Sequence, residues 1–152
     1  MGAYFLLPYA VVVIILMYAI MRGGAPERWV AGACMTALAI DPLYHSFFGS
    51  IQFDRFDIGH FLINGALLVA ALTVSLSANR FWPLVAAASQ LLSLIGQTNV
   101  LFLEGRSLAY WAVTQLPIYL TVLCILIGTI NHRKRIGSAL PVHDWRMQHL
   151  RT

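Results

Sequence analysis

Long runs of apolar residues, separated by short polar segments, make up most of this chain. A helix needs about 20 mostly apolar residues to cross the hydrocarbon core of a membrane. The runs that meet this requirement are residues 4–21, 29–48, 58–78, 82–103 and 108–130. The pattern therefore predicts an all-α membrane protein. We expect one bundle of five transmembrane helices over residues 1–130, followed by a basic cytoplasmic tail over residues 131–152.

Composition favours the membrane over water. Hydrophobic residues make up 59% of the chain and charged residues 11%, with a mean hydropathy of +0.74, whereas soluble domains carry about 25% charged residues. The net charge of +4 does not indicate nucleic-acid binding, because the basic residues lie at the ends of apolar runs. Cys34 and Cys124 lie within apolar runs and follow no disulfide or metal spacing, so we expect them to pack as small apolar side chains.

The distribution of basic residues predicts the orientation. An outside N-terminus places eight basic residues inside: Arg22, Arg28, Arg80, Arg133, Lys134, Arg135, Arg146 and Arg151. Only Arg55 and Arg106 then lie outside, as the positive-inside rule requires. No basic residue precedes the first run, so we expect it to be an uncleaved anchor. The basic cluster after residue 130 is expected to anchor this orientation or to dock a partner, and residues 144–147 to form a short interfacial helix.

Ionisable and amide side chains inside the runs carry the information about function, because they are costly in a membrane. Those spaced three or four residues apart, and therefore on one helix face, are Asp41, Tyr44 and His45 in the second run and Asp57, His60 and Asn64 at the start of the third. Alternating chain direction places further polar residues at a similar depth, namely Gln97, Asn99 and Gln115. We therefore expect a polar pocket among the second to fifth helices that opens toward the outer side.

Pro42 directly follows Asp41. Proline removes one backbone hydrogen bond and disfavours helix at the preceding residue. We expect the second helix to kink or break at this point, which would free backbone carbonyls beside the carboxylate.

Three interpretations of the polar residues stay open. They can be interhelical hydrogen bonds, which suits Gln90, Ser93, Thr114 and Gln115 best. They can form a metal site for Zn, Fe or Mn, with the ligands Asp41, His45, Asp57 and His60. A haem is less favoured, because His60 lies too shallow to be the second axial ligand. They can also bind or pass a small ligand, a lipid or a proton, with Asp41 as the proton carrier.

No enzyme signature is present: the chain has no glycine-rich phosphate loop, no His-Glu-x-x-His and no nucleophile elbow. The sequence favours a non-enzymatic subunit or binding protein with a polar pocket. A metal-dependent enzyme acting on a lipid or small ester, or a small transporter, is the alternative. The expected partners are the lipid bilayer and either a larger membrane complex or a second copy of the chain.

Two stretches resemble a family. They are residues 78–84 (ANRFWPL) with Gln90 beyond them, and residues 23–29 (GGAPERW) followed by Asp41, Tyr44, His45, Gly59 and His60. Both are similar to segments of small uncharacterised multi-pass inner-membrane proteins of alphaproteobacteria, which often carry a histidine where Gln97 stands here. The resemblance covers most of the chain. It implies a bacterial inner membrane and no particular activity.

Overall fold

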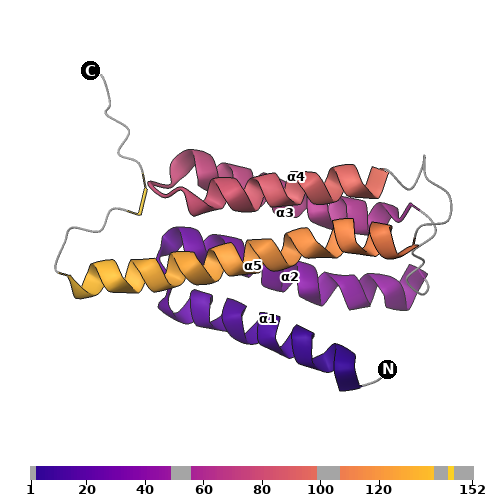
Figure 1. Ribbon diagram of the computed structural model, residues 1–152, viewed down its shortest axis with the longest axis horizontal. Helices are drawn as coiled ribbons and strands as arrows, with labels where there is room; N and C mark the ends of the chain where they lie inside the picture. The colour runs from indigo at the N-terminus through magenta and orange to yellow at the C-terminus, as the bar shows by residue number, and fades with distance from the viewer. Residues whose placement is uncertain (1–2, 49–55, 99–106, 139–143, 146–152) are drawn as a thin grey trace.

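The structure, a computed structural model, describes residues 3–48, 56–98, 107–138 and 144–145. It contains five helices: α1 (Ala3–Arg22), α2 (Ala25–Phe48), α3 (Ile58–Ser77), α4 (Trp82–Thr98) and α5 (Ser107–Gly137) (Figure 1). In these ranges the only β contact is an isolated bridge between Ala78 and Trp145. The expected all-helical class is confirmed.

The helices form a closed ring. Each helix packs against the next one in the chain, α5 closes the ring against α1, and α5 also contacts α2. In Figure 1, α5 lies between α4 above and α1 below. The buried Gln90 amide of α4 donates a hydrogen bond of 2.9 Å to the hydroxyl of Thr121, and Ser93 donates one of 3.2 Å to the Thr114 carbonyl. These bonds are the interhelical contacts expected for the amide and hydroxyl residues of α4.

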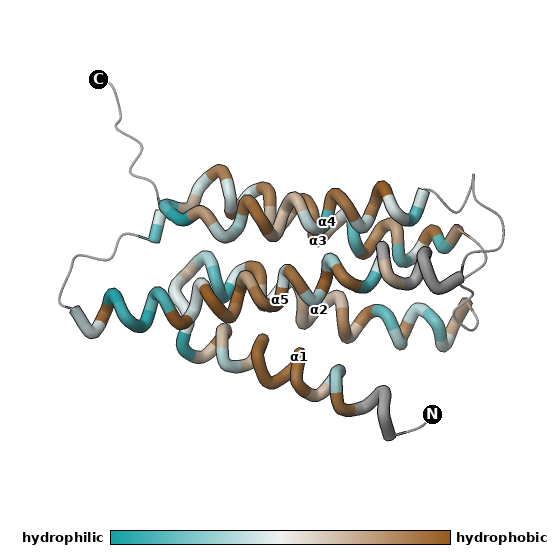
Figure 2. The backbone as a smooth tube through the Cα atoms, in the orientation of Figure 1, coloured by the Kyte–Doolittle hydropathy of each residue, from teal (hydrophilic) through white to brown (hydrophobic). Residues whose placement is uncertain are grey.

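Apolar side chains cover the outside of the bundle. Hydrophilic residues gather toward the two ends of the helices, and apolar residues fill the middle (Figure 2). By length and composition, two of the described helices can cross a membrane: α3, and the part of α5 from Thr114 to Gly137. Only 28% and 39% of their most apolar windows are buried, so more than half of each window is partly or fully exposed. Of the five expected spans, two thus have a helix that is long and apolar enough to cross a membrane.

α2 remains helical through Pro42 and ends at Phe48, so the break expected at this proline is not present. Pro42 has no N–H to offer the carbonyl of Leu38, four residues earlier. The Tyr9 hydroxyl of α1 donates to that carbonyl instead, at 3.2 Å. The neighbouring helix therefore satisfies the acceptor that proline leaves, which is how membrane helices tolerate proline.

A buried charged network joins the segments at the end of the bundle where α1 finishes and α2 begins. We call it the Arg80 cluster; its members are Glu27, Arg80, Trp82, His132 and Asp144. Glu27 is fully buried, and its Oε1 accepts hydrogen bonds from Arg80 Nη1 at 3.0 Å and from Trp82 Nε1 at 2.9 Å. Arg80 Nη2 donates to Asp144 Oδ1 and, at 2.7 Å, to His132 Nδ1. The cluster connects α2, the α3–α4 turn, α4, α5 and the tail.

The tail differs from the expectation in two ways. α5 continues to Gly137, seven residues beyond the expected end of the fifth span at Ile130, and His132 is buried rather than placed among headgroups. Asp144 and Trp145 are not helical; Asp144 accepts a hydrogen bond of 3.0 Å from the Ala25 backbone N–H, and Trp145 forms the bridge with Ala78. Residues 146 and 147 of the expected interfacial helix lie outside the described residues.

The Asp144 carboxyl is ionised at neutral pH. Burial raises its pKa, but the Ala25 N–H, the Arg80 guanidinium and His132 outweigh that effect and lower the pKa below its usual value. The tail is therefore held by charge-assisted bonds, which are the stronger kind.

Gly128 of α5 provides a test of this packing, because a Cβ there would lie 2.6 Å from the Trp82 indole nitrogen. We expect Gly128→Ala to push the indole away from Glu27 and to lower the free energy of unfolding by about 1–3 kcal/mol, measured by thermal unfolding in detergent. Gly65→Ala is the matched control, since its Cβ would meet nothing within 4 Å. The control should gain up to about 1 kcal/mol from helix propensity. Equal stability of the two variants would contradict this account of the cluster.

Candidate functional site

Two histidines and two carboxylates meet between α2 and α3. We call Asp41, His45, Asp57 and His60 the His60 cluster. His60 Nε2 lies 2.8 Å from Asp41 Oδ1 and 3.3 Å from His45 Nε2, and His45 Nε2 lies 3.8 Å from the same Asp41 oxygen. On its other side, His60 Nδ1 lies 3.0 Å from Asp57 Oδ2. His60 is therefore the centre of the cluster.

Local sequence explains the position of His60. Asp57 is the N-cap of α3, and its side chain accepts hydrogen bonds from the backbone N–H groups of Gly59 at 2.8 Å and His60 at 3.3 Å. One carboxylate oxygen thus caps the helix while the other holds the imidazole three residues later. Burial raises the pKa of Asp57, but the His60 N–H, the charge of His60, the Gly59 N–H and Tyr44 together lower it below its usual value.

An aromatic contact sets the register between α2 and α3. The Tyr44 ring packs directly on Gly59, where an added Cβ would lie 2.2 Å from Tyr44 Cζ. The same ring stacks on Phe48 with centroids 4.9 Å apart and meets His45 edge-on at 5.2 Å. Only glycine allows this approach, and the approach brings the histidine of α2 to within reach of the histidine of α3.

The electrostatics of the cluster call for a positive charge. A neutral His60 carries one ring proton, so one of its two nitrogens presents a lone pair to a carboxylate, either Nε2 to Asp41 or Nδ1 to Asp57. Two electron-rich atoms 2.8 or 3.0 Å apart repel each other unless a metal ion or a proton lies between them. The cluster is therefore arranged to hold either a metal ion or a proton.

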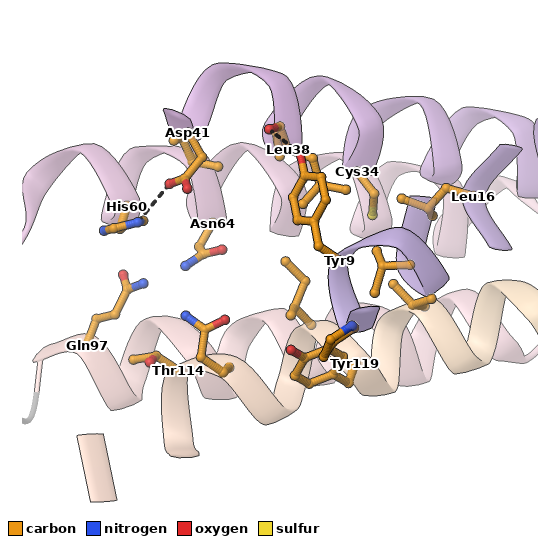
Figure 3. Close-up of a pocket in the computed structure, with 17 residues that line it drawn as sticks. Tyr9, Leu16, Cys34, Leu38, Asp41, His60, Asn64, Gln97, Thr114 and Tyr119 are labelled. Carbon is orange, nitrogen blue, oxygen red and sulfur yellow. Dashed lines mark hydrogen bonds and ion pairs between the residues drawn. The ribbon is translucent and has the colours of Figure 1, made fainter. Parts of the chain in front are cut away.

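A cavity of about 270 Å³ adjoins the cluster, and all five helices line it. Asp41 and His60 stand on one side, and Gln97 and Thr114 face them from α4 and α5 (Figure 3). Asn64 lies between the two sides. A ligand in this cavity would touch the Asp41–His60 pair directly.

The structure brings together most residues expected at the site. The four residues of the His60 cluster are in contact, Tyr44 packs against it, and Asn64, Gln97 and Gln115 line the adjoining cavity. Asn99 lies outside the described residues. The sequence analysis missed Tyr9, which reaches the cavity from α1, and it missed Glu27 of the Arg80 cluster. An acidic residue just before the second apolar run, on the same expected side of the membrane as Arg80, was the available signal for Glu27.

Comparison with protein-family models, with curated proteins and with solved structures finds no match to this chain. The resemblance to alphaproteobacterial inner-membrane proteins stays a prediction. What the His60 cluster does must therefore follow from its own geometry.

The two tasks of Asp57 can be separated by substitution. We expect Asp57→Ala to lower the free energy of unfolding by about 1 kcal/mol, because the first turn of α3 loses its cap. Asp57→Asn keeps a capping oxygen, so its thermal unfolding midpoint in detergent should stay near that of the wild type. If the asparagine variant lost as much stability as the alanine variant, the pairing with His60 and not the cap would be what stabilises this turn.

Proposed function

We propose that this chain is a small integral membrane protein that binds a divalent transition metal through Asp41, His45 and His60. The observation that carries the proposal is the convergence of His45 Nε2, His60 Nε2 and Asp41 Oδ1, which all lie within 4.8 Å of one another. Two imidazoles and one carboxylate form a ligand set for Zn²⁺ or Fe²⁺.

The spacing of the ligand atoms supports a metal. Bonds of about 2.0–2.2 Å to one ion place tetrahedral ligand atoms roughly 3.3–3.6 Å apart. The three separations here are 2.8, 3.3 and 3.8 Å, which bracket that range. An ion could therefore be bound with small adjustments of the side chains.

Asp57 supports the same conclusion. Metal-binding histidines usually donate the N–H of their other ring nitrogen to a carboxylate, which fixes the tautomer and the ring orientation. His60 Nδ1 has that partner in Asp57 at 3.0 Å. Three protein ligands leave a coordination position for water or another ligand, and the cavity lies beside Asp41 and His60. We therefore infer a binding protein whose metal contacts whatever occupies the cavity.

The placement in the membrane belongs to the same proposal. We infer five spans with the N-terminus outside, in the bacterial inner membrane, so that the His60 cluster lies in the outer half and the Arg80 cluster at the inner surface. Large apolar side chains with exposed fractions near 75%, at Phe47, Phe48, Leu76 and Phe81, support contact with lipid. The eight-to-two distribution of basic residues supports the orientation.

A proton on His60 is the second candidate, and one observation favours it. His60 lies between two carboxylates, at 2.8 Å from Asp41 and 3.0 Å from Asp57, and an imidazolium ion would satisfy both. In that case the cluster is a proton-carrying site of a membrane protein and binds no metal.

Metal content separates the two candidates. The protein is purified in detergent and dialysed against Zn²⁺, or against Fe²⁺ under anaerobic conditions. We expect elemental mass spectrometry to find about one metal ion per chain. The metal content of the Asp41→Ala, His45→Ala double variant should fall to the background level. Asp57→Asn should keep the ligands but bind roughly 10- to 100-fold more weakly.

A second double variant controls for metal that adheres to other histidines. His143→Ala, His149→Ala removes two imidazoles from the tail sequence and leaves the His60 cluster intact. Its metal content should equal that of the wild type. Equal content in the two double variants would rule out the metal site and favour the proton on His60.

The orientation is tested by cysteine labelling in intact cells. In a variant with Cys34 and Cys124 replaced by alanine, we expect Ser50→Cys to react with a membrane-impermeant maleimide, because residue 50 would face the exterior. Ser138→Cys should react only after the cells are opened. Labelling of residue 138 in intact cells would contradict the proposed placement of both clusters.

A further inference from the structure

The cavity beside the His60 cluster is polar at one end and apolar at the other. At the polar end are Asp41, His60, Asn64 and Gln97. Away from it, toward the middle of the bundle, the lining becomes apolar, with Leu16 of α1 and Cys34 of α2 (Figure 3). A ligand that fills such a cavity has a polar head and an apolar chain.

The cavity lies beside exposed side chains of α1 and α5. Tyr9 of α1 and Tyr119 of α5 both line it, and they are 47% and 41% exposed. In the membrane placement proposed above, this side of the bundle faces lipid. An amphiphile could therefore enter from the bilayer without passing through water.

A buried acceptor shows what the polar head must offer. Gln97 is 3% exposed, its amide points toward His60 across the cavity (Figure 3), and its Oε1 has no hydrogen-bond partner among the described residues. A buried acceptor without a donor costs about 1–3 kcal/mol, and a ligand with a hydroxyl group would supply the donor.

Apart from His60, the described side chains that line the cavity offer an anionic head no basic partner. The described residues that line it include the Asp41 carboxylate and no lysine or arginine. A phosphate head would meet this carboxylate without a basic partner, since Arg and Lys are the side chains that bind phosphate. A neutral head fits the lining.

We propose that the cavity binds a neutral single-chain lipid with a hydroxyl-bearing head, such as a monoacylglycerol. The head lies at Gln97 and the His60 cluster, and the chain lies along Leu16 and Cys34. This inference rests on the proposed membrane placement, and the preference for a neutral head holds for the metal-free cluster, because a bound divalent ion would attract an anionic head.

Photocrosslinking tests the proposal with the protein in a lipid bilayer. The wild-type chain is reconstituted into phosphatidylcholine nanodiscs with a monooleoylglycerol that carries a diazirine in its acyl chain. We expect crosslinks at cavity residues such as Leu16 and Cys34. Unlabelled monooleoylglycerol should displace the probe at a concentration at least tenfold lower than lysophosphatidic acid with the same chain.

Two glutamine variants of α4 serve as test and control. Gln97→Leu removes the buried acceptor and should raise the concentration of monooleoylglycerol needed for half displacement about tenfold. Gln90→Leu removes a buried glutamine that bonds Thr121 and does not line the cavity, so displacement should be unchanged. Crosslinks confined to lipid-facing residues such as Leu76, equal displacement by the anionic lipid, or an unchanged Gln97→Leu variant would overturn the proposal.

Metal content is measured on the same nanodiscs, so the two proposals can fail separately. Bound metal without cavity crosslinks would reject the lipid and keep the metal. Cavity crosslinks in protein that binds no metal would reject the metal and keep the lipid.

Discussion

The arrangement of the helices depends on the buried charge of Arg80. A buried guanidinium is tolerated only when acceptors surround it, because removing one partner of a buried ion pair costs about 3–5 kcal/mol. Here the acceptors come from three other parts of the chain: Glu27 at the start of α2, His132 near the end of α5, and Asp144 in the tail. Pairing the two Nη nitrogens of one side chain therefore holds four segments together, and the opposite ends of α2 and α3 meet at the His60 cluster.

Local spacing made part of the site predictable. Offsets of four residues between Asp41 and His45, and of three between Asp57 and His60, place each pair on one helix face. Alternating chain direction then placed both pairs in the outer half of the membrane, with His60 shallower than Asp41, and the structure brings them into contact. The all-helical class followed equally from the lengths of the apolar runs, although only two helices in the described ranges meet the criteria for a membrane span.

Contacts between distant segments could not be predicted from spacing. The bond between Glu27 and Arg80 joins residues 53 positions apart, and that between Tyr9 and the Leu38 carbonyl joins residues 29 apart. The second bond also explains why the break expected at Pro42 is missing, since a neighbouring helix supplies the donor that proline lacks. Such compensation depends on tertiary packing, and a helix read by itself shows only the missing bond.

The contact between Asp144 and Arg80 has a consequence for the folding of the chain during its synthesis. Glu27 is synthesised first, Arg80 follows 53 residues later, and Asp144 is added 64 residues after Arg80. Until then the arginine has only part of its set of acceptors. The Arg80 cluster is thus complete only after residue 144 has been made, and a chain truncated before that residue would leave the buried Arg80 short of one anion.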